Sequence, residues 1–115
     1  MTMVNLTPHE VAVFDGERVV VRVAPSGIFA RLAEHVRLGD GLETGTVRIP
    51  TVTVMYEARV LGLPEPSPGT IFVVSRVLAA EVRRPDIYFP HDEVRDEAGR
   101  IIGFRALGQF DSRDA

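Results

Sequence analysis

Arginine is the only side chain in this protein that can hold an anion with a permanent positive charge. All 13 basic residues are arginine, and the chain contains no lysine. A guanidinium group is planar and forms paired hydrogen bonds with carboxylates and phosphates. We therefore expect any anion that this protein binds to be held by guanidinium groups.

Five residues form the candidate ligand-binding set. Ser75 and Arg76 begin a predicted helix, where free backbone N–H groups attract anions. Arg31 and Arg95 lie on or beside predicted strands, at positions that face outward, and His9 lies near the N-terminus. If the fold gathers four of these side chains around one cleft, the cleft suits a phosphate or a carboxylate; the four are Ser75, Arg76, Arg95 and His9. In the alternative interpretation, each arginine pairs with a neighbouring acid on the surface and contributes little.

His9 lies in the segment Thr7-Pro8-His9-Glu10, which has capping-box spacing. A strand-like run follows it, so we expect one turn of helix or a structured bend. His9 then either donates a proton or a polar contact at a pocket mouth, or simply holds a turn. Tyr56 and the segment Tyr88-Phe89-Pro90 could stack against a base, or could be ordinary core aromatics.

The sequence does not predict an enzyme. Ser75 is not in a G-x-S-x-G elbow, and the three histidines are scattered along the chain. The segment His91-Asp92-Glu93 with Asp96-Glu97 holds metal-ligand side chains, but its spacing matches neither an EF-hand nor H-E-x-x-H. We interpret it as a solvated acidic loop. We predict no catalytic residue, no metal site and no cofactor.

Composition predicts one domain, residues 1–115, in a reducing compartment. The chain has 115 residues and no cysteine, which excludes disulfides and thiolate zinc sites. Its formal charge of −3 argues against non-specific binding to nucleic acid. No signal peptide and no stretch long enough to span a bilayer is visible, so we expect a cytoplasmic protein that is not bound to a membrane.

The elements that must position the candidate residues are mostly strands. Asp15-Gly16 and Ala98-Gly99 are turn dipeptides flanked by strand-like runs, and each predicts a hairpin. Residues 28–38 and 52–60 alternate between apolar and other side chains, which is typical of strands with one buried face. Residues 39–45 are predicted to form a flexible loop, and residues 71–74 a central strand that is covered on both faces.

One short helix completes the prediction. Ser75 is suited to cap residues 76–84, and Pro85 ends that helix. We expect residues 111–115 to fray. The fold class is therefore mainly β: a small antiparallel barrel or two-layer sandwich with one short helix.

Four motifs follow one another in a specific order. They are Asn5-Leu6-Thr7-Pro8-His9, Pro25-Ser26-Gly27 with Ala30-Arg31, residues 62–76 (GLPEPSPGTIFVVSR), and Arg95-Asp96-Glu97 with residues 99–103 (GRIIG). Together they resemble a family of proteins of about 100 residues encoded by bacteriophages, prophages and actinobacterial genomes. The family has no established activity. The resemblance implies a phage or mobile-element accessory protein that acts in the bacterial cytoplasm.

These observations predict a non-enzymatic binding module. We favour one that sequesters a small anionic, nucleotide-like ligand. Such a protein is expected to be a homo-oligomer, because a small β domain forms a deep pocket more readily across a subunit interface. The alternative is a protein-interaction or structural accessory that binds a host or phage protein through an exposed apolar strand around residues 52–60.

Overall fold

A computed structural model describes residues 1–111 of the chain. The predicted fraying of residues 111–115 therefore falls almost entirely outside the described residues. The chain is mainly β with one short helix, as the sequence predicted. In chain order, the elements are β1 (Thr2–Asn5), β2 (Val11–Asp15), β3 (Arg18–Val23), β4 (Arg31–Leu38), β5 (Leu42–Thr44), β6 (Val47–Ile49), β7 (Val52–Leu61), β8 (Thr70–Val73), α1 (Arg76–Glu81), β9 (Ile87–Arg95) and β10 (Ile101–Gly108).

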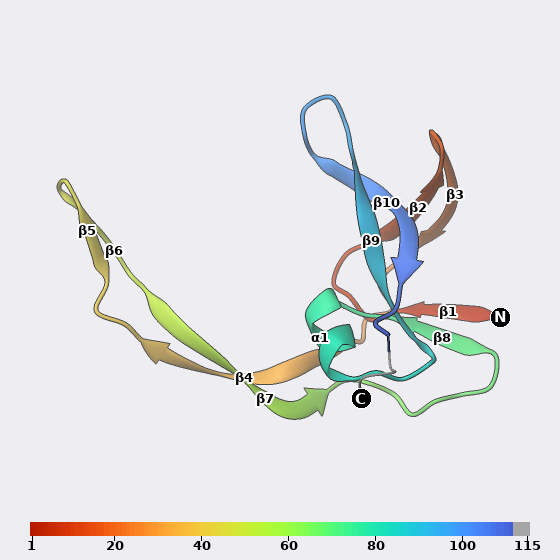
Figure 1. Ribbon diagram of the computed structural model, residues 1–115, viewed down its shortest axis with the longest axis horizontal. Helices are drawn as coiled ribbons and strands as arrows, with labels where there is room; N and C mark the ends of the chain where they lie inside the picture. Colours follow the sequence, from red (N-terminus) through yellow and green to blue (C-terminus); the bar gives the residue numbers. More distant parts are fainter. Residues whose placement is uncertain (112–115) are drawn as a thin grey trace.

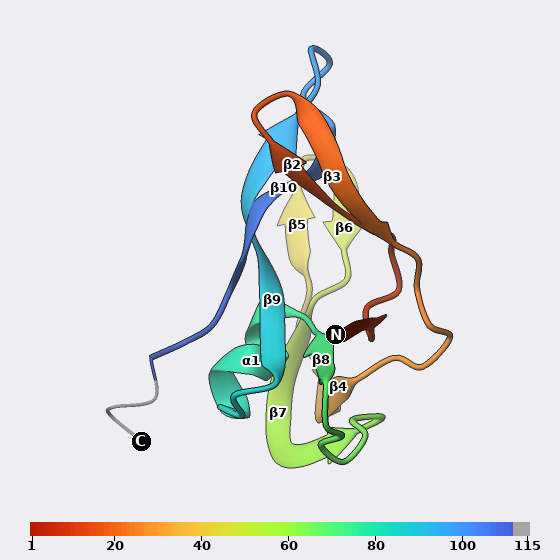
Figure 2. The same cartoon turned by 90° about the vertical axis from the view of Figure 1, so that its right-hand side faces the viewer.

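Six strands form one curled sheet in the order β1-β8-β9-β10-β2-β3, which makes a half-barrel (Figures 1 and 2). The sheet is mixed rather than purely antiparallel. Strand β8 runs parallel to both of its neighbours, and β10 runs parallel to β2. The two edge strands approach each other at one end, where the Ser26 N–H donates to the Asn5 carbonyl at 2.9 Å.

The core lies where the half-barrel meets α1 and the beginning of β4. Its buried residues are Leu6, Ala30, Leu32, Phe72, Val74, Leu78, Ala79, Ile87 and Phe89. Strand β8 is paired on both sides, and Phe72 and Val73 are buried, which confirms a covered central strand in this segment. Burial of these aliphatic and aromatic side chains is the main favourable contribution to folding.

Both predicted hairpins form. Gly16 and Gly99 have φ of 63° and 82°, a left-handed conformation that glycine adopts without the steric cost of a side chain. The first turn joins β2 to β3, and the second joins β9 to β10. The turn dipeptides are thus sufficient to locate two of the connections.

Asn5 explains the structured bend predicted for residues 7–10. Its side chain is 1% exposed. Its amide donates to the carbonyls of His9 and Val23 at 2.7 and 3.0 Å, and its oxygen accepts from the Thr7 N–H at 2.9 Å. One buried amide therefore fixes the bend and joins it to the end of β3.

Helix α1 is shorter than the predicted helix of residues 76–84 and ends at Glu81. Ser75 caps it as predicted, because its Oγ accepts from the Leu78 N–H at 3.3 Å. Arg84 lies beyond the helix end. Its guanidinium group makes a bidentate ion pair with Asp86 instead of interacting with the end of the helix.

Strands β4 and β7 pair with each other and project from the half-barrel as a long arm, which β5 and β6 extend (Figure 1). We call β4 to β7 the arm. Two predictions are corrected here. Residues 39–45 are not a flexible loop, because Leu42 pairs with Ile49 in a second hairpin. The predicted buried face of residues 28–38 is covered near Leu32, whereas Val36 and Leu38 are exposed within this chain.

Candidate functional site

A cleft opens where the arm leaves the half-barrel, and α1 forms one of its walls. Its volume is about 570 Å³. We call it the basal cleft. It is lined by Phe29, Arg31, Leu32, Ala33, Glu34, Tyr56, Arg59, Leu61, Ser75, Val77 and Leu78. This volume is in the usual range for small-molecule sites.

Arg31 is the first charged residue of β4, and its guanidinium group is exposed. Its Nη1 donates to the carbonyl of Phe29 at 3.0 Å, and its Cζ lies 5.6 Å from the centre of the Phe29 ring. Within residues 1–111, Arg31 forms no ion pair with a carboxylate. Most of its hydrogen-bond donors therefore face solvent and can receive an anion.

Arg59 brings a second guanidinium group to the basal cleft from β7. Its Nε lies 3.4 Å from a carboxylate oxygen of Glu57, and the same carboxylate contacts His35. Glu57 partly balances the charge of Arg59, so Arg31 is the stronger candidate for binding an anion. Exposed pairs of this kind are weak, and an incoming ligand can compete with them.

A change of register places Tyr56 and Glu34 on the cleft. Leu32 pairs with Val60, but Glu34 pairs with Tyr56, so β7 carries two extra residues at this point. Such a bulge bends a strand and redirects its side chains. Tyr56 and Phe29 are 54% and 44% exposed, which leaves two aromatic surfaces accessible at the cleft.

Ser75 joins this site through its position between β8 and α1. Its Oγ already accepts the cap hydrogen bond from Leu78, but its hydroxyl proton can still be donated. The structure therefore brings together two of the five predicted ligand-binding residues, Arg31 and Ser75.

The other three predicted residues lie elsewhere. Arg76 points away from the basal cleft, with its Cζ 5.0 Å from the ring centre of Phe89 and 5.6 Å from that of Phe110. Arg95 lies at the β9–β10 turn, where it forms a 2.6 Å ion pair with Glu93. Neighbouring residues on a strand or helix point in different directions, so adjacency of Ser75 and Arg76 did not place both on one surface.

His9 lines a separate hollow of about 300 Å³, together with Glu10 and residues 101–104. Its backbone carbonyl, rather than its ring, makes the hydrogen bond to Asn5. The expected gathering of Ser75, Arg76, Arg95 and His9 around one cleft does not occur in this fold.

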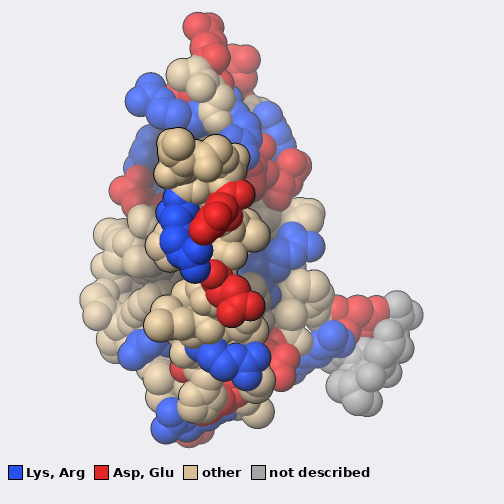
Figure 3. All heavy atoms as spheres, turned by 90° about the vertical axis from the view of Figure 1, so that its left-hand side faces the viewer, with Lys and Arg blue, Asp and Glu red and all other residues tan. Residues whose placement is uncertain are grey.

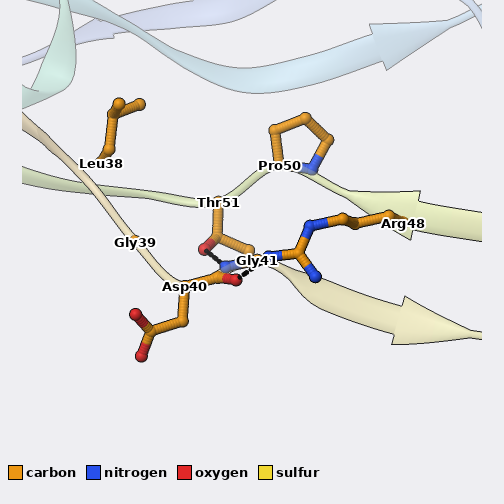
Figure 4. Close-up of a pocket in the computed structure, with 7 residues that line it drawn as sticks. All are labelled: Leu38, Gly39, Asp40, Gly41, Arg48, Pro50 and Thr51. Atoms are coloured by element: carbon orange, nitrogen blue, oxygen red, sulfur yellow. Dashed lines mark hydrogen bonds between the residues drawn. The ribbon is translucent and has the colours of Figure 1, made fainter.

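A third hollow, of about 270 Å³, lies at the bend between the two hairpins of the arm (Figure 4). Arg48 Nη2 donates to the carbonyl of Asp40 at 2.6 Å, and the Gly41 N–H donates to Thr51 Oγ1 at 3.0 Å. Arg48 also pairs with Glu43 at 2.9 Å. Because these groups bond one another, we interpret this hollow as the joint of the arm rather than as a ligand site.

Arg84 and Asp86 form an ion pair that is not part of the lining of the basal cleft. The hydrogen bonds from Arg84 lower the pKa of Asp86, and the same bonds raise the pKa of Arg84. Arg84 also donates to the carbonyl of Pro64 at 3.1 Å. The pair thus connects the proline-rich loop, residues 62–69 between β7 and β8, to the turn before β9.

Two further observations concern residues 1–111. No group of three or more histidine and carboxylate side chains there is arranged to hold a metal ion. None of the helical segments in that range has the length and apolar character required to cross a membrane.

Sequence reasoning did not select Phe29, Glu34 or Arg59, which the structure places at the basal cleft. Tyr56 was considered only as a possible stacking residue. The missing signal was the register change in β7, which brings Tyr56 opposite Glu34. Regular alternation cannot predict such a bulge.

Searches of protein-family models, of curated proteins and of solved structures found no match to this chain. The resemblance to phage and actinobacterial proteins therefore stays a prediction.

Proposed function

We propose that this protein is a non-enzymatic module that binds a small anionic ligand carrying an aromatic ring, such as a nucleotide, in the basal cleft. The position of the Arg31 guanidinium group is the main support for this proposal. Its guanidinium group lies at a cleft of about 570 Å³ beside two exposed aromatic rings, and no carboxylate within residues 1–111 neutralises it.

Each group at the cleft matches a part of such a ligand. The guanidinium groups of Arg31 and Arg59 suit phosphate or carboxylate oxygens. The rings of Phe29 and Tyr56 offer stacking surfaces for a base. Glu34 would repel a second anionic group, but its carboxylate can accept hydrogen bonds from the hydroxyls of a sugar.

The lining of the cleft also supports binding without turnover. Glu34 is the only carboxylate among its lining residues, and the lining includes no histidine, cysteine or lysine. General acid–base chemistry on a bound ligand commonly uses a second acid or base placed opposite the first. The two hydroxyl groups of the lining have other roles in this proposal, Ser75 as the cap of α1 and Tyr56 as a stacking surface. The proposal therefore assigns recognition to the cleft and no bond cleavage.

A second candidate function is that of a protein-interaction accessory, which the exposed arm favours. Val52, Val54 and Tyr56 of β7 are each about half exposed, as expected for a docking strand. Both proposals include the phage or mobile-element context and the cytoplasmic location that the resemblance implies. A stoichiometric protein partner recovered from host lysate would favour this second candidate.

Calorimetry tests the first proposal. The chain is titrated with ADP, cyclic nucleotides and ADP-ribose, and with the corresponding uncharged nucleosides. We expect binding of at least one anionic member, and at least a ~10-fold loss of affinity in Arg31→Gln, because one charge-assisted contact is lost. Arg100→Gln is the matched control, since Arg100 pairs with Asp96 far from the cleft. Silence across the panel, or equal losses in both variants, would contradict the proposal.

A further inference from the structure

One face of the arm is apolar and uncovered. Val36 pairs with Val54 and Leu38 pairs with Val52, so these four side chains point to the same side of the hairpin. Tyr56 follows Val54 at the next position on that side. We call these five residues the arm face, and they are between 45% and 85% exposed.

The opposite side of the same hairpin is largely polar. It carries the paired residues Arg37 and Thr53, and it carries His35, whose ring contacts Glu57. Met55 is its apolar exception. The hairpin is therefore amphipathic, and an alternation of this kind is typical of strands with one buried face.

Figure 3 views the molecule from the side from which the arm projects. Charged side chains follow the middle of this view, and a broad uncharged surface adjoins them. A sheet of two strands is marginal in water by itself and needs a covering layer. Nothing within residues 1–111 supplies that layer, because β4 and β7 form a separate two-stranded sheet and the arm face is exposed.

The accessible surface area of the chain is larger than that of a compact monomer of the same length. Its accessible surface is 8156 Å². A compact monomer of 115 residues exposes about 6,200 Å², so the excess is about 1,900 Å². The radius of gyration is 17.3 Å, against about 13 Å for a compact domain. A stable interface needs about 800 Å² from each partner. The excess for the whole chain is larger than this, as expected for a chain whose projecting arm has an uncovered apolar side.

We propose that the arm face packs against the arm face of a second copy of this chain, so that the protein is a two-fold dimer. The five residues of the arm face carry no charge, so two copies can pack these apolar side chains together. Glu34, which pairs with Tyr56 on the same side, lies at the end of this surface that lines the basal cleft. Arg37, His35 and Glu57 remain in water on the outer side. A two-fold interface uses the same patch twice, so an apolar face can pack against its own copy.

The dimer would also adjoin the basal cleft. Tyr56 belongs to the arm face and lines the cleft, and its cross-strand partner Glu34 lines the cleft as well. A second arm on this face would lie beside the open cleft and reduce its exposure. This inference does not depend on ligand binding, and the dimer is tested without a ligand.

Sedimentation equilibrium of the full chain and three variants tests the dimer. Val54→Glu and Leu38→Glu place a charge in the arm face, whereas Thr53→Glu places the same charge on the next residue, which faces outward. We expect a dimer for the unmodified chain at micromolar concentrations. Both arm-face variants should weaken it by at least ~100-fold, because each buries an unpaired carboxylate in the interface. Thr53→Glu should change the dissociation constant less than ~3-fold, as is typical of exposed sites.

Circular dichroism verifies that all three variants fold, since each substituted side chain lies outside the core. A monomer at high micromolar concentration would overturn the inference. Equal changes of the dissociation constant in Thr53→Glu and Val54→Glu would also overturn the inference. So would a dimer that persists in both arm-face variants, because the interface would then lie elsewhere. The calorimetric test of ligand binding does not depend on the outcome of the dimer experiment. The proposal for the basal cleft and the proposal for the arm face are therefore tested separately.

Discussion

Arg84 and Asp86 form a bidentate ion pair, with nitrogen–oxygen distances of 3.0 and 2.7 Å, at the turn between α1 and β9. Both side chains are less than one quarter exposed. Because Arg84 also donates to the carbonyl of Pro64, the pair connects the proline-rich loop to the sheet. That loop follows β7, so the pair helps to fix the beginning of the arm and the basal cleft beside it.

Asp86→Asn should lower the free energy of unfolding by about 2 kcal/mol at pH 7, because a mostly buried, charged hydrogen-bond pair is lost. The pKa of Asp86 is lowered in the folded protein by Arg84. Its contribution is therefore complete above the ordinary carboxyl pKa of about 4 and is lost as the pH falls through the lower folded value. Urea titrations of both proteins from pH 7 to pH 2 should show converging stabilities. A difference that stays constant between pH 7 and pH 2 would contradict this account of the pair.

Gly62→Ala should destabilise the fold by more than about 2 kcal/mol and should disturb the basal cleft. Gly62 has φ of 76°, and a Cβ there would press against the carbonyl oxygen of Phe29, which also accepts the hydrogen bond from Arg31. Gly45→Ala is the matched control. Gly45 has φ of 58° but open space around its Cβ position, so only the backbone cost of about 1 kcal/mol applies. Thermal unfolding compares the two variants, and equal losses would show that contact with Phe29 is unimportant.

Asn5→Asp should cost about 3 kcal/mol or more at neutral pH. The substitution keeps the shape but replaces two donated hydrogen bonds with a buried negative charge that faces the carbonyls of His9 and Val23. Lowering the pH should recover part of the loss, because protonation removes the charge. His9→Ala is the comparison, since only the backbone of His9 takes part in this network. Chemical denaturation measures both, and a large loss in His9→Ala would assign the bend to the imidazole instead.

Arg76→Gln should reduce stability by about 1 kcal/mol, although the sequence placed Arg76 in a ligand site. Its guanidinium group lies over the rings of Phe89 and Phe110, which stack on each other with centroids 4.8 Å apart. A cation over an aromatic ring contributes about this much at a partly exposed site. A thermal unfolding experiment with Arg76→Lys tests the mechanism. Arg76 Nη1 also lies 3.4 Å from Nδ1 of His91. The lysine variant should retain part of the stability if the positive charge matters, and none if only this contact with His91 matters.

Local signals in the sequence were sufficient for much of the fold. Gly16 and Gly99 adopt the positive φ that their turn dipeptides predicted, and Ser75 caps the helix that it precedes. The alternation in residues 52–60 correctly predicted β7. These features depend on a few adjacent residues, so the sequence reveals them directly.

Features that depend on distant contacts were not visible. The residues from Gly39 to Gly45 were predicted as a flexible loop because of their glycines, but Leu42 pairs with Ile49 across a second hairpin. Alternation in β4 predicted a covered face without indicating what covers it. The basal cleft depends on the register change opposite Glu34 and on the position of α1, neither of which follows from a local pattern.

Amide chemical-shift mapping tests the central claim of ligand binding most directly. The uniformly ¹⁵N-labelled chain is titrated with whichever anionic ligand binds by calorimetry, and with ADP if several do. We predict shifts concentrated in three segments, residues 29–34, 56–61 and 75–78, which are far apart in sequence and meet at the basal cleft. Shifts centred on His9 or on the turn at Arg95, or no saturable shifts at all, would contradict it.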